Sequence, residues 1–401
     1  MVERLEPRTL LSWTDYALVG AYYDIDAFAY SETGTILDDG SLLGELRYPG
    51  VGGPGSPFSS TWEFLDFDGP TFQVTNYEGF DPYVYDNGAS FNDEYGAGWY
   101  LGDDDLFSAA EIAFIIERPD DASVEDFLGD WAFSEVRMSS DVANDATVDG
   151  FHGRWTVQGS TIDLVATGVL GTSEATWTID SVDEQGLAII DTQTWAWISD
   201  DGSVVIYVDM DLADGQSGLG VAVRPAAAPT MADVAGGFRV ASLFSGDLAL
   251  VEFALPMVFG DTYLDLDEGG TWTGHALDAW DAGDLSDPFG GTWSLDGDEV
   301  VLLDGLSGGE ARYVVASNGS TLLGQRMVND EIRDPFLAVA TRDEPPIAFS
   351  PTGISTAARD AEGRAIAYEQ RTNGLWYAVD LQTQAGGEGI TGEIISWISV
   401  E

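Results

Sequence analysis

The amino-acid sequence predicts an all-β protein of three tandem antiparallel units, each a β-barrel or a β-sandwich, followed by a partial β module. Apolar and polar residues alternate over short runs, as around Ile162 and Leu164, and this period of two is typical of half-buried strands. Ten Asp-Gly or Asn-Gly pairs separate such runs, and these pairs tolerate the positive φ angles of tight hairpins. No amphipathic pattern longer than two helical turns stands out. Meandering antiparallel sheet is therefore the architecture that the pattern favours.

A threefold internal repeat is the third observation, and it sets the expected domain boundaries. Each copy opens with the pattern apolar-x-Gly-x-aromatic. Further along it has a Trp that precedes a run of alternating apolar and polar residues, and it closes with a β-like stretch that ends in Arg. The landmarks are Gly20, Tyr22, Trp62 and Arg118, then Gly129, Trp131, Trp155 and Arg224, then Gly236, Phe238, Trp293 and Arg342. We expect a lead-in at residues 1–15, β units at 16–120, 121–230 and 231–345, and a different segment at 346–401.

The Gly-x-Trp start and closing Arg of the second unit resemble the signature of the calycin superfamily, which includes the lipocalin-like and avidin-like barrels. The resemblance implies that Trp131 plugs the closed end of a barrel and that Arg224 lies across its ring. A guanidinium over an indole face is worth about 0.5–2 kcal/mol, and Tyr22 or Phe238 in the other units is a weaker partner. Units of about 108 residues are short for eight strands plus turns. A plain antiparallel sandwich of another family therefore stays open as the alternative.

Residues 347–401 follow another pattern, with strand-like runs at 365–370, 375–381 and 393–400. Asn373-Gly374 separates the first two runs, and a Gly-rich stretch separates the last two. This order resembles the opening blade of a β-propeller. Because one blade cannot bury both faces of its sheet, we expect the chain to be a fragment of a longer protein.

Residues 4–12, Arg-Leu-Glu-Pro-Arg-Thr-Leu-Leu-Ser, resemble the LEPR-XLL sorting motif at the N-terminus of large surface and secreted proteins of planctomycete bacteria. The resemblance implies export to the cell surface or the extracellular space and assigns these residues no chemistry. A chance amphipathic turn is the alternative. No window approaches the ~20 apolar residues of a membrane helix, so we expect no membrane insertion.

The charge balance excludes two classes of partner. The chain has 70 acidic and 15 basic residues, a net charge of −55, and every basic residue is Arg. Nucleic acids and anionic membranes bind cationic surfaces, so neither is expected as a partner. Dissolved salt or divalent cations must screen this charge, which suits a saline exterior. Base-composition bias explains much of the missing Lys, but it does not explain 70 carboxylates.

The sequence offers no catalytic constellation, and we expect a non-enzymatic protein. The chain has no Cys, and its two histidines, His152 and His275, fall in different units. Residues 305–309 match the Gly-x-Ser-x-Gly pattern of a nucleophile elbow, but they lie in a Gly-rich turn with no His after them. Carboxylate pairs are too numerous for a glycosidase pair to be singled out. No organic cofactor is implied.

Calcium is the one cofactor with a candidate site. Asp209, Asp211 and Asp214 precede a turn Gly, and Ca²⁺ takes six to eight oxygen ligands. The stretch departs from the EF-hand loop because residue 220 is Gly where a bidentate acid should stand. An ordinary hairpin turn is the alternative, and diffuse binding of divalent cations by the acidic surface is a second one.

Aromatic residues are the best candidates for ligand recognition. Trp195 and Trp197 lie two positions apart on one expected strand face, where they could stack on sugar rings. The alternative is that they form core. We thus expect an exported protein with a structural, adhesive or ligand-binding role, whose partners are carbohydrate or other surface proteins. Two rivals remain: a secreted hydrolase with its catalytic module beyond residue 401, and a lipocalin-like carrier of small molecules.

Overall fold

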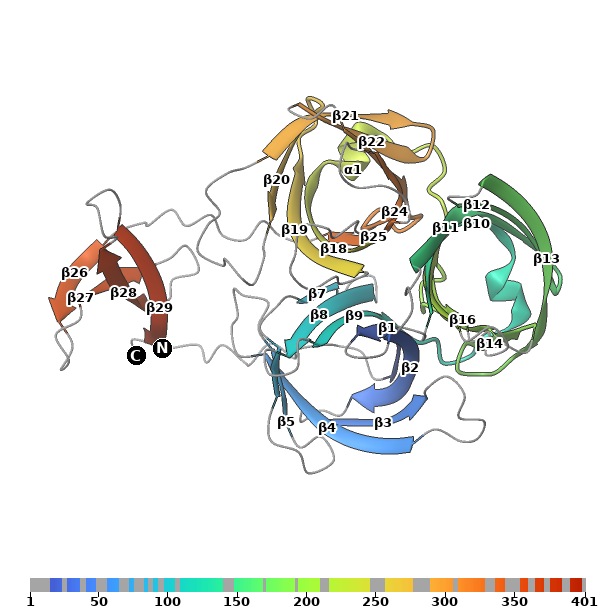
Figure 1. Cartoon of the computed structure of the whole chain (residues 1–401), viewed down its shortest axis with the longest axis horizontal. Coiled ribbons are helices and arrows are strands. Elements are labelled where there is room, and N and C mark those ends of the chain that lie inside the picture. Colours follow the sequence, from blue (N-terminus) through green and yellow to red (C-terminus); the bar gives the residue numbers. More distant parts are fainter. Residues whose placement is uncertain are drawn as a thin grey trace, which may run out of the picture.

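The structure is a computed structural model, and it confirms an all-β fold (Figure 1). The described residues are 15–23, 27–36, 41–47, 56–64, 72–75, 83–85, 89–92, 97–104, 109–139, 148–168, 171–191, 194–209, 216–245, 257–276, 289–305, 309–328, 336–342, 354–359, 365–370, 376–383 and 390–398. Three large β units lie side by side, and a small sheet stands apart at the left of the view. The sorting-like residues 4–12 lie outside the described part.

The first unit is a nine-stranded antiparallel sheet, here called sheet 1, in the order β6-β5-β4-β3-β2-β1-β9-β8-β7. Its strands are β1 Asp15–Tyr23, β2 Ala27–Ile36, β3 Ser41–Arg47, β4 Ser56–Phe64, β5 Phe72–Thr75, β6 Tyr83–Tyr85, β7 Ala89–Asn92, β8 Ala97–Asp104 and β9 Ala109–Glu117. Because β1 pairs with both β2 and β9, the first and last strands of the unit are neighbours.

The second unit is a closed eight-stranded antiparallel barrel, here called barrel 2. A short 3-10 helix, η1 Val124–Phe127, precedes it. Its strands are β10 Gly129–Ser139, β11 Val148–Gln158, β12 Thr161–Gly168, β13 Gly171–Val182, β14 Leu187–Ile190, β15 Thr194–Ile198, β16 Val204–Asp209 and β17 Gln216–Val223. Pairing of β10 with β17 closes the barrel.

The third unit, barrel 3, repeats this arrangement and is also closed. One helical turn, α1 Met231–Val234, precedes it as η1 precedes barrel 2. Its strands are β18 Gly236–Ser245, β19 Met257–Leu266, β20 Thr271–Ala276, β21 Phe289–Asp296, β22 Glu299–Asp304, β23 Glu310–Val315, β24 Thr321–Val328 and β25 Phe336–Arg342. Closure of these two barrels decides against the sandwich for the second and third units. The expected shortage of residues was wrong, because eight short strands and tight turns fit between residues 129 and 223.

The C-terminal segment forms a four-stranded antiparallel sheet in sequence order. Its strands are β26 Ile354–Arg359, β27 Ala365–Gln370, β28 Trp376–Thr383 and β29 Ile390–Ile398. The sequence pattern predicted three of these strands and missed β26. No helix among the described residues has the length and apolar character needed to cross a bilayer.

The outer faces of the three large units share one apolar cluster, here called the junction. Strand β16 shows why: all six of its residues are buried, since one face lines the barrel and the other faces a neighbouring unit. The junction joins Val19 and Phe114 of sheet 1, Ile206 of β16, and Leu323 and Val339 of barrel 3. Burial of these faces stabilises the assembly by roughly 25 cal/mol per Å² of apolar surface. The three units therefore pack as one body.

Candidate functional site

The closed end of barrel 2 is built around Arg224. Its guanidinium carbon lies 4.4 Å from the centre of the Trp131 ring. The same group donates hydrogen bonds to the carbonyl oxygens of Leu128 (2.7 Å), Asp126 (2.8 Å) and Gly202 (3.1 Å). The Trp131 indole in turn donates to the Phe127 carbonyl oxygen at 2.8 Å. One arginine thus ties together residues 124–128, here called the plug, strand β10 and the β15–β16 hairpin.

Barrel 3 has the same arrangement of arginine over an aromatic ring, but the ring belongs to Phe238, which is a weaker cation–π partner than Trp. The Arg342 guanidinium lies 4.9 Å from the centre of the Phe238 ring. It donates to the carbonyl oxygens of Asp233 (2.8 Å), Ala235 (2.9 Å) and Gly319 (3.1 Å). The positions of these partners correspond to those in barrel 2, so the two closed ends have a common construction.

The repeated glycines make room for the overlying arginine in the two barrels, whereas in sheet 1 the equivalent glycine makes room for a tyrosine ring. Gly129 has φ +111° and Gly236 has φ +133°, and a Cβ there would meet Nη1 of the overlying arginine at 3.0 and 2.7 Å. At Gly20 a Cβ would instead meet the Tyr30 ring at 2.4 Å. A side chain is therefore excluded at all three positions, but for two different reasons.

Arg118, the closing arginine of sheet 1, is buried and is directed elsewhere. Its Nη1 donates to Gln185 Oε1 of barrel 2 at 3.0 Å, and its Nη2 lies 3.7 Å from Asp15. Burial lowers the pKa of its guanidinium, and nearby Asp15 opposes that effect. The side chain of Tyr22, its expected ring partner, lies outside the described residues. Arg118 therefore fastens sheet 1 to barrel 2.

Aromatic side chains fill the middle of barrel 2. The Trp155 ring lies 5.3 Å from Phe133, 5.1 Å from Tyr207 and 6.2 Å from Trp177, measured between ring centres. Gly220 makes room for this stack, because a Cβ there would lie 2.0 Å from the Tyr207 ring. Apolar residues from η1 and from all eight strands surround it in a single cluster.

A partly buried ion cluster lies beyond this stack, where β10 and β16 end. Arg137 Nε donates to Glu135 at 2.5 Å, and Arg137 Nη2 donates to Asp209 at 3.0 Å. Tyr207 donates to the other oxygen of Glu135 at 3.1 Å. Glu135 raises the pKa of Arg137, whereas burial, more than Glu135, raises that of Tyr207. Sequence reasoning missed this cluster, although Glu135 and Arg137 at inward positions of one strand could have signalled it.

The ion cluster includes one of the three calcium candidates. Asp209 is only 8% exposed and faces Arg137, and it also accepts a hydrogen bond from Thr194 at 3.3 Å. Asp211 and Asp214 lie outside the described residues. The part of the chain that the structure describes contains no group of three or more His, Asp or Glu side chains placed to hold a metal ion.

The two tryptophans proposed for stacking belong to the outer face of β15. Trp197 is 1% exposed and lies within the junction, and Trp195 packs half-buried against the same cluster. The Trp197 ring is thus covered by protein, which agrees with the alternative that this residue forms part of the core. Among the other candidates, His152 is half-buried on β11, whereas residues 306–308 and the side chain of His275 lie outside the described part.

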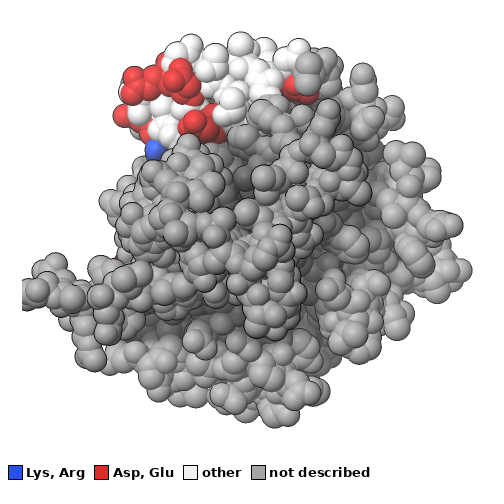
Figure 2. All heavy atoms as spheres, turned by 90° about the vertical axis from the view of Figure 1, so that its left-hand side faces the viewer, with Lys and Arg blue, Asp and Glu red and all other residues white. Residues whose placement is uncertain are grey.

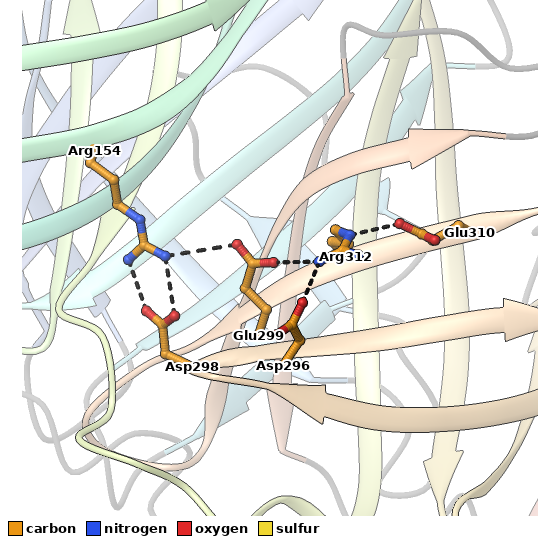
Figure 3. Close-up of polar contacts among 6 residues, drawn as sticks. All are labelled: Arg154, Asp296, Asp298, Glu299, Glu310 and Arg312. Carbon is orange, nitrogen blue, oxygen red and sulfur yellow. Dashed lines mark hydrogen bonds and ion pairs between the residues drawn. The ribbon is translucent and has the colours of Figure 1, made fainter.

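A chain of ion pairs joins barrel 2 to the β21–β22 hairpin of barrel 3 (Figure 3). Arg154 reaches from β11 to both oxygens of Asp298, at 2.8 and 3.3 Å, and lies 3.8 Å from Glu299. Glu299 then accepts from Arg312 at 3.0 Å, and Arg312 also donates to Glu310 at 2.6 Å. The bond to Glu310, followed by that to Glu299, raises the pKa of Arg312.

Two buried hydrogen bonds also cross between the barrels. Ser134 of β10 donates to the Gly324 carbonyl oxygen at 2.6 Å, and Gln325 donates to the Phe133 carbonyl oxygen at 2.7 Å. The arginines described here pair with carboxylates or donate to backbone or side-chain carbonyl oxygens, but the 15 arginines of the chain are outnumbered by 70 acidic residues. The described surface seen in Figure 2 accordingly shows several acidic patches and only a small basic one.

Comparison with known proteins gives no family. No family model matches the sequence, and no curated protein matches it. Among solved structures, transferrin-binding protein B from Haemophilus parasuis is 10% identical with a TM-score of 0.28, over 82% of this chain and 75% of that chain. The protein of that name from Neisseria meningitidis is 10% identical with a TM-score of 0.27, over 82% and 76%. A Nostoc punctiforme protein of the DUF3598 family is 9% identical with a TM-score of 0.18, over 84% and 97%. At TM-scores of this size we draw no inference from the likeness.

Proposed function

We propose that this chain is an exported, non-catalytic protein of the cell surface or extracellular space, and that it binds its partners through its outer surface. The observation that carries this proposal is the filled interior of barrel 2. Phe133, Trp155 and Tyr207 occupy its middle, and the Glu135–Arg137 pair occupies the region beyond. A carrier of small molecules needs an apolar cavity at this place.

The buried carboxylates support a non-catalytic role. A hydrolase of the glycosidase type needs two carboxyl groups that face a substrate, one of them protonated. Glu135 and Asp209 instead share Arg137, and their other oxygens accept hydrogen bonds from Tyr207 and Thr194. Neither group is left to transfer a proton or to attack a sugar.

Bulk features support the exterior location. The resemblance of residues 4–12 to a sorting motif supports export, and a net charge of −55 suits a protein bathed in salt. Carbohydrate and other surface proteins are the partners we propose, together with divalent cations bound diffusely. Millimolar Ca²⁺ should then raise the melting temperature, and EDTA should reverse the rise; no shift with either would exclude calcium binding.

A lipophilic-probe titration tests the filled interior. We expect anilinonaphthalene sulfonate and cis-parinaric acid to show no saturable binding to the intact chain. The matched control is Trp155→Ala, which opens an apolar cavity in barrel 2 and should create a site for a small apolar guest. One-to-one binding to the unmodified chain, with quenching of its tryptophan fluorescence, would overturn the proposal. Protease treatment of intact source cells, which should cleave an exterior protein, tests the location.

A further inference from the structure

Strand β13 is much longer than the strand that follows it in barrel 2. It pairs with β12 from Gly171 to Thr178, but it pairs with β14 only from Ile179 to Val182. Within the part of the chain that the structure describes, no strand pairs with the other edge of residues 171–177. Residues 171–176 are all exposed. Barrel 2 thus retains an open edge, here called the β13 edge, although the barrel as a whole is closed.

The register shows which backbone groups lie on this edge. The Asp191 N–H donates to the Thr178 carbonyl oxygen at 3.0 Å, and the Thr178 N–H donates to Asp191 Oδ1 at 2.9 Å. The backbone of Thr178 therefore points away from β12. Since this direction repeats every second residue in a strand, the N–H and C=O groups of Thr172, Glu174 and Thr176 point the same way. They form a row of hydrogen-bonding groups along the open edge.

This edge lacks the devices that usually protect an exposed strand. Natural proteins place Pro, several charges or a bulge on such edges. Residues 171–178, Gly-Thr-Ser-Glu-Ala-Thr-Trp-Thr, contain no Pro and a single charge at Glu174. The bulge of β13 lies beyond the edge, between Ile179 and Ser181. The edge is therefore a ready template for another extended chain.

Charge decides which chain the edge can accept. Two copies of a protein with a net charge of −55 repel each other, so pairing of β13 with β13 is opposed. Glu174 lies on the edge, and Asp180 lies exposed just past it on β13. Asp163, exposed on β12 on the other side of β13, accepts a hydrogen bond from Thr176 at 3.2 Å and adds a more distant negative charge. These charges attract a cationic segment and speed its encounter.

We propose that the β13 edge binds an extended, cationic peptide segment of another protein, which adds to barrel 2 as a further strand. Main-chain hydrogen bonds to Thr172, Glu174 and Thr176 hold the segment in register. Glu174 on the edge and Asp180 just past it favour Lys or Arg in the positions of the segment that face them. This assignment rests on the proposed function, because it names one partner class for the outer surface.

Synthetic peptides test the edge without altering the protein. The probe is acetyl-Lys-Thr-Lys-Val-Lys-Thr-Lys-amide, titrated calorimetrically, and its matched control replaces each Lys by Glu. A second pair carries N-methyl groups on the odd-numbered or on the even-numbered residues. We expect saturable binding of the Lys peptide, weakening with salt, and at least about tenfold weaker binding of one methylated peptide but not of the other. Equal binding of both methylated peptides, or of the Lys and Glu peptides, would overturn the proposal.

Hydrogen exchange and two variants locate the binding. Free protein should exchange the amides of Thr172, Glu174 and Thr176 quickly, and the Lys peptide should protect them. Thr176→Pro removes an edge N–H that β12 does not use and should weaken binding about tenfold, whereas Thr176→Val keeps the N–H and should bind as before. Protection of these amides in the free protein, or protection that rises with protein concentration, would show the edge already occupied and refute the assignment. Neither result bears on the lipophilic-probe test, so the two proposals fail separately.

Discussion

Removal of the Arg224 guanidinium is the sharpest test of how the barrels are closed. Arg224→Met keeps an unbranched side chain and removes every hydrogen-bond donor. The variant loses three charged hydrogen bonds, to the carbonyl oxygens of Asp126, Leu128 and Gly202, and the contact with the Trp131 ring.

The expected loss in the free energy of unfolding depends on what replaces each lost contact in the Arg224→Met variant. The plug carbonyls lie near the surface, where water can take the place of the guanidinium, so each hydrogen bond contributes about 1 kcal/mol rather than the larger value of a buried charged bond. The contact with the indole ring adds about 1 kcal/mol. We therefore expect the free energy of unfolding of barrel 2 to fall by about 3–4 kcal/mol.

The measurement is urea unfolding followed by tryptophan fluorescence, with hydrogen exchange at the Leu128 amide as a local probe of the plug. Arg342→Met in barrel 3 is the matched control, because it removes three equivalent hydrogen bonds and a long one to the Val234 carbonyl oxygen (3.4 Å), but Arg342 faces Phe238, a weaker partner than Trp. Its cost should be smaller by about 0.5–1 kcal/mol. A loss below about 1 kcal/mol for Arg224→Met, with unchanged exchange at Leu128, would refute the reasoning.

Three further predictions follow from single contacts. Gly220→Ala places a Cβ 2.0 Å from the Tyr207 ring and should destabilise the protein by about 2–3 kcal/mol in urea; a change under about 0.5 kcal/mol would contradict the packing described. The Thr230 hydroxyl is the main cause of the lowered pKa of Asp233, so this contact stabilises the fold above the unfolded pKa and is lost as pH falls through the folded value. Thr230→Ala should raise the Asp233 pKa in an NMR titration, and an unchanged titration would exclude the contact. Arg154→Gln should cost less than about 1 kcal/mol, and the cost should shrink in high salt because the pair is partly exposed; a salt-independent cost would argue against an ionic contact.

The residue pattern predicted the all-β class because strand periodicity and hairpin turns are local properties. Asp201-Gly202 and Asn318-Gly319 are examples: each occupies a turn, with Gly202 at φ +67° and Gly319 at φ +71°. The pattern could not decide between barrel and sandwich, since that choice depends on whether the first and last strands of a unit pair. The pairing of β10 with β17 joins residues that are 77 to 91 positions apart, from Ser139 with Gln216 to Ala132 with Val223.

The candidate sites were harder to predict, because a side chain's role depends on what faces it. Trp197 looks like a stacking residue along one strand, but the apolar cluster shared by the three units buries its ring. Asp209 looks like a carboxylate of a hairpin turn, but it is the last residue of β16 and its side chain faces Arg137, which lies 72 positions earlier in the sequence. In both cases the deciding neighbour is distant in sequence.

The sequence by itself determined the strands, the turns, the repeated Gly and Arg landmarks and the strongly acidic character. These depend on backbone preference and composition, which a chain has before it folds. Only the tertiary structure decided that the two later units close as barrels, that the three units share one junction, and that β13 keeps an open edge. Each of these depends on the lengths and registers of strands that meet only after folding, because hydrogen bonds and apolar burial reward the whole arrangement rather than any one segment.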